Sequence, residues 1–341
     1  GESMSRQVTI SEVAKLAGVH PSTVSRALNP ATRSVVNEKT VRRVKSAAES
    51  LNYVPNIMAR GLRTRLSMTI GVIIPDLTNP IFPAIIRGIE GHLGPLGYTT
   101  LLADVDGDTA LEGHAISSLV QRQVDGLIIA TGVEQSSLVK ALAQSGVPVV
   151  LVNRGASETG YSLVTGDDEM GIRASVNHLH QLGHRDIVHI AGPQSFSTSR
   201  GRADAIRRAC DDRSINLKTV YAEALTVEQG EMVTNRLLTE SNRSFTAIQA
   251  STDLLALGAL RAIRQHGLIC PDDISVSGFN DMPFAEEFSP GLTSVRVPLE
   301  EIGIEAATQL MRAINDGHGS SLVVTLPVSL VIRASTGPAT I

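Results

Sequence analysis

Hydrophobic and polar positions predict two regions of different texture, which meet near residue 66. The N-terminal region shows helical spacing only. A first helix over 11–17 ends at Gly18, which suits the position after a helix C-terminus. A second helix over 22–28 follows Pro21, which suits the first helical position. A third helix over 38–51 completes the order helix, tight turn, helix, loop, helix.

From residue 69 onward, short apolar runs alternate with amphipathic helical stretches, which indicates repeated strand–helix units. The predicted strands cover 69–74, 100–105, 126–130, 148–152, 187–191, 246–250 and 274–278. The pattern occurs twice, which predicts two similar α/β lobes with doubly wound parallel sheets. These lobes cover about 67–160 and 162–290, with later crossover segments. Ligands of such folds bind beyond the carboxyl ends of the strands, here in a cleft between the lobes.

The whole-chain charge of −4 conceals an uneven distribution. The first 66 residues hold 11 Lys and Arg against 4 Asp and Glu, whereas the rest of the 341-residue chain holds 19 against 30. A basic module of net charge +7 is therefore joined to an acidic body of net charge −11. The basic module suits contact with a phosphate backbone, which would repel the acidic body.

Composition and terminal features predict a cytoplasmic protein without a membrane segment. No apolar run approaches the length of a membrane span. Cys210 and Cys270 are too few for a disulfide framework and are expected to stay reduced. The first three residues carry no signal-peptide pattern and are interpreted as an expression remnant ahead of Met4.

Motifs of enzymes are absent from the sequence. It carries no GxxxxGK[ST] phosphate loop, no GxSxG elbow and no GxGxxG after a strand. Paired acids such as Asp167-Asp168 stand at segment starts, where helix capping explains them. His178, His180 and His184 have poor spacing for a metal site, and a helix-end role is favoured. No catalytic residue, metal or cofactor is therefore expected.

The first two helices have the spacing of a helix-turn-helix, whose second helix enters the DNA major groove. Its exposed early positions are Pro21, Ser22, Ser25 and Arg26. Arg26 can pair with guanine O6 and N7, Ser22 can bond either a donor or an acceptor, and Pro21 can contact a thymine methyl. The alternative is a helical hairpin that only packs; the basic excess and the polar face weigh against it.

The sequence resembles the lactose-repressor (LacI) family over essentially its whole length. The most specific stretches are VTISEVAKLAGV at 8–19 and STVSRALN at 22–29. Weaker stretches follow in family order: YVPN at 53–56, ARGLRT at 59–64, IGVIIPD at 70–76, NPIF at 79–82, VDG at 124–126, LGHR at 182–185 and DISV at 273–276.

The resemblance implies a homodimeric transcriptional repressor whose DNA affinity is set by a small molecule. It implies an all-α helix-turn-helix headpiece at 4–54, a hinge helix and linker at 55–66, and a two-lobed periplasmic-binding-protein-like effector and dimerisation domain at 67–341. The partners would be a palindromic double-stranded DNA operator and a sugar or sugar derivative, with a nucleobase or nucleoside as the alternative effector.

The resemblance also assigns DNA contacts. Leu62 matches the family's wedge leucine, which opens the minor groove at the centre of the palindrome; a core contact against the basic module is the alternative. Further contacts are implied for Thr9, Thr23, Asn29, Asn56 and Ala59. Two positions depart from the family pattern. His20 stands where Ser usually caps the recognition helix, and Pro21 replaces a larger base-reading side chain of some relatives.

For the effector, Arg202 aligns with the family's ligand-binding arginine, and Asp253 follows the polar contact position Thr252. Asn280 stands where many relatives have Asp, which makes a charged-amine ligand less attractive because Asn also donates. Aromatic or apolar cleft walls are implied for three residues: Phe82, which is equally a candidate for lobe core, Phe196 and Leu225. Three residues close strands and face either the ligand, a capping partner or the other lobe: Asp76, Asn153 and Arg154.

Two other classes compete with the repressor. A periplasmic-type sugar-binding protein would share the lobes, but it does not explain residues 4–66 or the missing signal pattern. A sugar-metabolising enzyme would need a catalytic constellation. A dimer is favoured over a tetramer, since no leucine-heptad tail follows the last predicted strand region.

Overall fold

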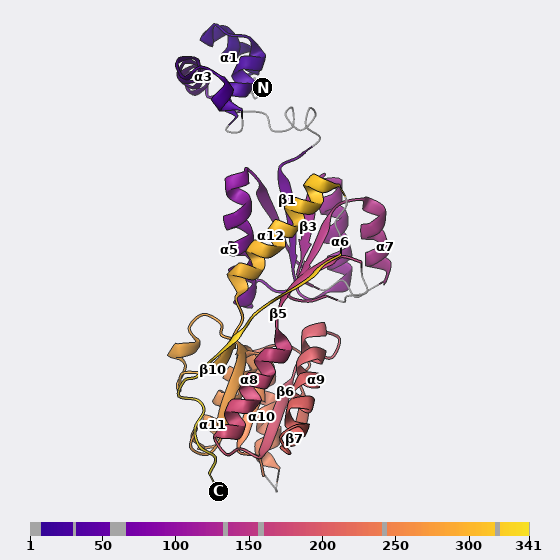
Figure 1. Ribbon diagram of the computed structural model, residues 1–341, viewed down its shortest axis with the longest axis vertical. Coiled ribbons are helices and arrows are strands. Elements are labelled where there is room, and N and C mark those ends of the chain that lie inside the picture. The colour runs from indigo at the N-terminus through magenta and orange to yellow at the C-terminus, as the bar shows by residue number, and fades with distance from the viewer. Residues whose placement is uncertain are drawn as a thin grey trace, which may run out of the picture. The chain divides into compact units, whose positions relative to one another are not determined.

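The computed structural model forms two compact units, Gly1–Ser67 and Met68–Ile341 (Figure 1). It describes residues 8–29, 32–54, 66–131, 136–155, 160–240, 244–317 and 321–340.

The first unit is helical in the predicted order. Its elements are α1 (Ile10–Ala17), α2 (Pro21–Leu28), the 3-10 helix η1 (Arg33–Val35) and α3 (Glu38–Ser50). Thr9 and Glu12 form a reciprocal capping box at the start of α1, and Gly18 ends that helix in the left-handed region at φ 62°. Val13, Val24 and Val44 are fully buried where the three helices pack together.

The second unit contains two sheets of six strands each. The first sheet has the order β11-β5-β4-β3-β1-β2, with β1 (Thr69–Ile74), β2 (Thr99–Asp104), β3 (Gly126–Ile129), β4 (Val149–Val152), β5 (Ser162–Gly166) and β11 (Val323–Leu326). The second has the order β12-β10-β9-β8-β6-β7, with β6 (Asp186–Ala191), β7 (Asn216–Tyr221), β8 (Ala247–Ala250), β9 (Ser275–Asn280), β10 (Thr293–Arg296) and β12 (Ser329–Val331). All described pairs are parallel except β10 with β12.

Helices cover both sheets. They are α5 (Ile81–Leu93), η2 (Gly94–Leu96), α6 (Thr109–Gln121), α7 (Ser136–Ser145), α8 (Asp168–Gln181), α9 (Ser197–Asp211), α10 (Val227–Thr239), α11 (Asp253–Gln265), η4 (Ala285–Glu287) and α12 (Leu299–Asp316). The predicted doubly wound parallel sheets are confirmed.

The predicted start of the second lobe at residue 162 is wrong. Strand β5 pairs with β4 and β11, so Ser162–Gly166 belongs to the first sheet. The chain returns to the first lobe with α12 and β11 and then enters the second sheet again with β12 (Figure 1). The lobes are therefore built from interleaved segments, and the chain crosses between them three times.

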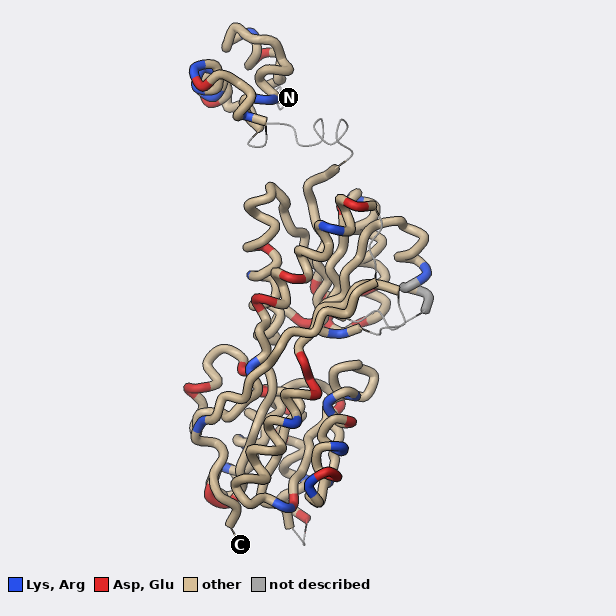
Figure 2. The backbone as a smooth tube through the Cα atoms, viewed as in Figure 1, with Lys and Arg blue, Asp and Glu red and all other residues tan. Residues whose placement is uncertain are grey.

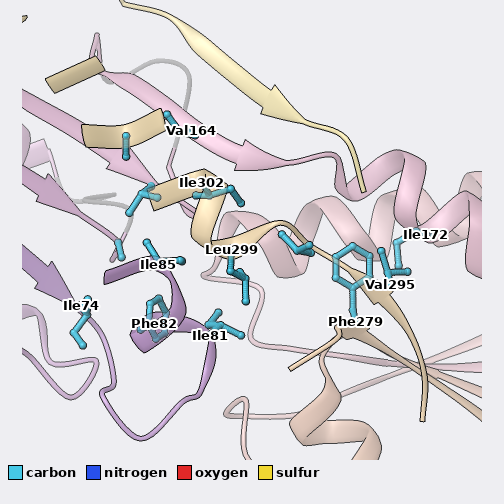
Figure 3. Packing of buried hydrophobic residues seen from close by; sticks show 14 of the residues in the cluster. Ile74, Ile81, Phe82, Ile85, Val164, Ile172, Phe279, Val295, Leu299 and Ile302 are labelled. Atoms are coloured by element: carbon cyan, nitrogen blue, oxygen red, sulfur yellow. The ribbon is translucent and has the colours of Figure 1, made fainter. Parts of the chain in front are cut away.

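Helices α5 and α12 of the first lobe pack closely enough to require glycine. A Cβ on Gly88 of α5 would lie 2.0 Å from the Glu300 carbonyl oxygen of α12, and one on Gly303 would lie 2.1 Å from the Ile85 carbonyl oxygen. Figure 3 shows Phe82 and Ile85 beside Leu299 and Ile302, in a buried cluster that continues to Phe279 of the second lobe. This cluster links the two lobes along the crossover into α12.

Candidate DNA interface and effector site

Helix α2 buries one face and presents another. Val24 and Ala27 are fully buried in the helical unit, whereas Arg26 is exposed. The remaining predicted contact residues of this segment are partly exposed: Pro21, Ser22, Thr23, Ser25 and Asn29. The geometry presents a polar surface on α2, as the sequence predicted.

Two further features of the helical unit bear on DNA binding. The His20 ring caps α2, because the Ser22 amide donates to its Nδ1 at 3.3 Å, so His20 fulfils the capping role of the usual serine. Figure 2 shows basic positions gathered along α3, which carries Lys39, Arg42, Arg43 and Lys45.

Thr9 is occupied at the start of α1, where its hydroxyl donates to Glu12 at 2.9 Å. The predicted contacts Asn56, Ala59 and Leu62 lie outside the described residues.

In the second unit, most predicted effector residues follow the carboxyl ends of parallel strands. Asp76 comes after β1, Asn153 and Arg154 after β4, and Thr252 and Asp253 after β8. Asn280 ends β9 with a φ of 109°, and Phe196 precedes α9. This is the edge at which doubly wound sheets place ligands.

Arg202 lies at the centre of a buried polar cluster. Its Nε and Nη2 contact Oδ1 of Asp168 at 3.1 and 3.0 Å, and its Nη1 donates to the Ser251 carbonyl oxygen at 2.7 Å. The guanidinium also stacks 3.8 Å from the ring centre of Phe279. Burial raises the pKa of Asp168, and the charge and hydrogen bonds of Arg202 oppose that rise. Arg202 is therefore positioned by protein partners on several sides.

The partners of Arg202 were not predicted from the sequence. Helix capping was expected to account for the pair Asp167-Asp168, yet only Asp167 caps α8, by accepting from the Met170 amide at 2.9 Å. Asp168 begins the helix and turns to Arg202. The sequence did carry a signal for this partner: a helix cap needs only one carboxylate, so the second acid, Asp168, called for another role.

Two buried polar atoms belong to the same neighbourhood. Within the described part of the chain, Nε2 of His189 and Oγ of Ser251 have no hydrogen-bond partner. Burial, with the charge of Arg202 as a smaller cause, lowers the pKa of His189 to about 4, so the ring is neutral. Unpartnered buried polar groups are rare and mark places where a ligand can complete the bonding.

The two lobes touch at the strand ends. The Arg154 guanidinium of the first lobe lies 3.9 Å from the ring centre of Phe196 in the second. The neighbouring amide of Gly155 donates to Ser197 Oγ at 3.2 Å. Arg154 thus contacts the other lobe through the aromatic ring of Phe196.

Asp253 is fully enclosed, and both carboxylate oxygens have protein donors. The Ser294 hydroxyl donates to Oδ1 at 2.6 Å, and the Met282 amide donates to Oδ2 at 2.7 Å. Burial raises the pKa of Asp253 to about 7 against these hydrogen bonds. The geometry makes Asp253 a clamp between α11, β10 and the loop after Asn280.

Four other predicted effector residues have structural contacts of their own. Phe82 is 1% exposed within the buried cluster of Figure 3, which favours the core alternative over a ligand wall. Asp76 accepts from Thr78 and closes its own turn. Thr252 caps α11. Leu225 is partly buried against the second-lobe core.

His178 and His184 of the second lobe contact the segment that follows Arg333. His178 Nε2 lies 2.8 Å from Thr336 Oγ1, and His184 Nε2 lies 3.0 Å from the Gly337 carbonyl oxygen. Among the described residues no cluster of His, Cys, Asp or Glu is placed to hold a metal, and no helix is long and apolar enough to cross a membrane.

A helical unit with an exposed polar recognition helix, joined to a two-lobed α/β unit with a polar cluster at its strand ends, defines a ligand-responsive DNA-binding regulator. The model for bacterial regulatory proteins of the lacI family matches residues 9–56, and the periplasmic binding protein-like domain matches residues 176–336. The chain belongs to the lacI family of bacterial regulatory proteins and is a DNA-binding transcriptional regulator.

Its relatives are regulators and not enzymes. The HTH-type transcriptional regulator DegA of Bacillus subtilis is 32% identical over 97% of this chain and 99% of its own length. The structure of the lac repressor dimer bound to operator and the anti-inducer ONPF is similar with a TM-score of 0.86 and 30% identity, covering 97% of this chain and all of that one. A LacI family regulator from Enterococcus faecium with bound ribose has a TM-score of 0.72 and 29% identity, covering 80% of this chain and all of that one.

Proposed function

We propose that the protein is a homodimeric, sequence-specific repressor whose affinity for a palindromic operator is controlled by a sugar or sugar derivative. The observation that carries the proposal is the union of the helix-turn-helix surface on α2 with the buried Arg202–Asp168 cluster at the strand ends. Residues 4–54 form the headpiece, 55–66 the hinge and 67–341 the effector and dimerisation domain.

At the operator, Arg26 pairs with guanine, and its neighbours on α2 set register and base preference. Five partly exposed residues accompany Arg26: Pro21, Ser22, Thr23, Ser25 and Asn29. Thr9 contacts the phosphate backbone of the DNA. The hinge contributes Asn56 and Ala59, and Leu62 wedges into the minor groove, where the cost of unstacking is offset by contacts with bent DNA. The +7 charge of residues 1–66 doubles in a dimer and supports phosphate contact.

The effector binds at the strand ends between the lobes. Arg202 and Asn280 supply donors and acceptors, and Phe196 and Arg154 close one side. The unpartnered atoms of His189 and Ser251 supply further polar contacts of the kind that hydroxyl groups complete. A sugar is favoured because a relative of similar fold holds ribose; a nucleobase or nucleoside is the alternative.

The dimer forms through the edge of the first sheet. Strand β2 is an edge strand, and its Leu101 and Leu102 are 36% and 44% exposed, with Leu111 of α6 49% exposed. Such apolar edges are usually covered in solution. The lac repressor to which this chain is similar is a dimer on its operator. A regulator of this kind acts in the cytoplasm, where Cys210 and Cys270 stay reduced.

Footprinting of the purified protein on genomic promoters tests the proposal. We expect salt-sensitive protection of a palindromic site that one class of sugar abolishes or strengthens. Thermal-shift screening against sugars, sugar phosphates and nucleobases identifies the effector class, because a ligand specific for the folded state raises the melting temperature. Absence of specific protection with and without ligands would contradict the repressor function.

A further inference from the structure

The side chain of His20 determines which hydrogen-bonding groups of Ser22 remain available at the start of α2. The Ser22 amide donates to His20 Nδ1 at 3.3 Å, and the Ser22 hydroxyl oxygen lies 2.8 Å from the same nitrogen. A nitrogen that accepts from a backbone amide carries a lone pair and not a proton. The ring proton is therefore on Nε2, and the hydroxyl of Ser22 must be the donor in the second contact.

The contact with His20 fixes whether the Ser22 hydroxyl donates or accepts toward another partner. A free serine hydroxyl can rotate, so it can donate to or accept from a base edge. In this protein the hydroxyl hydrogen of Ser22 is held by His20, and only the lone pairs of Oγ remain for another partner. Ser22 is partly exposed in the first turn of α2, among the predicted base-reading positions.

We propose that His20 is a positioning residue that makes Ser22 an acceptor-only reader of the operator, so that the base opposite Ser22 is adenine or cytosine. In the major groove those two bases present an amino donor, N6 of adenine or N4 of cytosine, whereas guanine and thymine present only acceptors at the matching positions. The inference rests on the proposed operator binding and adds to it the base class at one position of each half-site.

The test begins with selection of duplexes from a randomised pool by the wild-type protein and by Ser22→Ala. The position at which Ser22→Ala loses base preference is the one that Ser22 reads. We expect adenine or cytosine there in the wild-type selection. In synthetic duplexes, a hypoxanthine–cytosine pair in place of that adenine–thymine pair, or a uracil–adenine pair in place of that cytosine–guanine pair, replaces the amino donor with an oxygen and keeps the base paired. We expect the exchange to weaken wild-type binding about 10-fold.

The variant His20→Ser separates the capping of α2 from the effect of His20 on the hydroxyl of Ser22. A serine at this position can still accept an amide of the first turn, so α2 keeps a cap, but Ser22 regains a freely rotating hydroxyl. We expect His20→Ser to bind the selected duplex within about 3-fold of wild type and the base exchange to cost it only about 2-fold. His20→Ala should lose the cap as well and bind every duplex more weakly.

Three results would overturn the inference: guanine or thymine at the position that Ser22 reads, an unchanged penalty for the base exchange in His20→Ser, or no position whose preference depends on Ser22. A wild-type protein that enriches no sequence contradicts the proposed operator binding itself, and the inference falls with it. Enrichment without dependence on Ser22 leaves operator binding intact and refutes only the role of His20.

Discussion

The buried carboxylate of Asp253 should make the stability of the second unit depend on pH in a direction opposite to that of most carboxylates. Its pKa is raised by burial to about 7 in the folded protein, from an ordinary value of 3.8. Between these values the folded chain binds a proton that the unfolded chain does not. Linkage then requires the free energy of unfolding to fall as pH rises from about 4 to 7 and to recover as pH falls.

The magnitude follows from the size of the shift. A difference of about 3 pH units corresponds to about 4 kcal/mol of differential stability, at about 1.4 kcal/mol per unit. Asp253→Asn removes this dependence while keeping the geometry, because the amide oxygen can accept from Met282 and the amide nitrogen can donate to a rotated Ser294 hydroxyl. The variant is expected to fold.

Urea unfolding of wild type and Asp253→Asn at a series of pH values measures the effect. The chain has no tryptophan, so circular dichroism is the appropriate signal. Both proteins share all other titratable groups, including Asp168, so the difference between their unfolding free energies isolates Asp253. We expect that difference to change by about 3 kcal/mol between pH about 4.5 and about 7, with wild type gaining relative stability at the lower pH. Parallel pH profiles would refute the assignment of a neutral, buried Asp253.

Three further predictions concern the packing of α5 against α12, the buried Arg202–Asp168 ion pair and the proposed DNA contact of Arg26. Gly88→Ala should lower the free energy of unfolding by about 3 kcal/mol, because the added Cβ would lie 2.0 Å from a backbone oxygen of α12. Gly91→Ala on the same helix is the control: its Cβ meets no atom within 4 Å, so the change should be neutral or stabilising by up to about 1 kcal/mol. Equal melting temperatures of the two variants would contradict the close crossing of α5 and α12. Arg202→Met should lower the free energy of unfolding by about 3–5 kcal/mol, because it leaves the Asp168 carboxylate buried without its ion-pair partner. Adding Asp168→Leu should restore much of the stability measured by urea unfolding, but not the ligand-induced thermal shift. A double variant that is no more stable than Arg202→Met would argue against the ion pair. Arg26→Ala should weaken specific operator binding by about 1–3 kcal/mol and relax base preference, as measured by fluorescence anisotropy; an equal loss on random DNA would make Arg26 a phosphate contact only.

Local pattern was enough to predict the helix-turn-helix and the alternating lobes. Thr9, Glu12, Gly18 and Pro21 act through bonds within a few residues, so their roles follow from spacing. The buried strands read as apolar runs because both faces are covered. Strands β5, β7, β10, β11 and β12 were not predicted. Strands β7, β11 and β12 lie at sheet edges, where exposure weakens the apolar signal.

In the candidate effector site, too, some features follow from local sequence and others depend on the tertiary structure. The sequence determined which residues stand at strand ends, because a polar residue after an apolar run is a local feature: Asn153, Thr252 and Asn280 are examples. Only the tertiary structure decided their partners. Arg202 meets an acid 34 positions away, and Asp253 meets a serine 41 positions away. Such pairs depend on sheet order and on the three crossings between the lobes, which periodicity does not encode, and that is why the bonds of Arg202 to Asp168 and of Asp253 to Ser294 were not predicted.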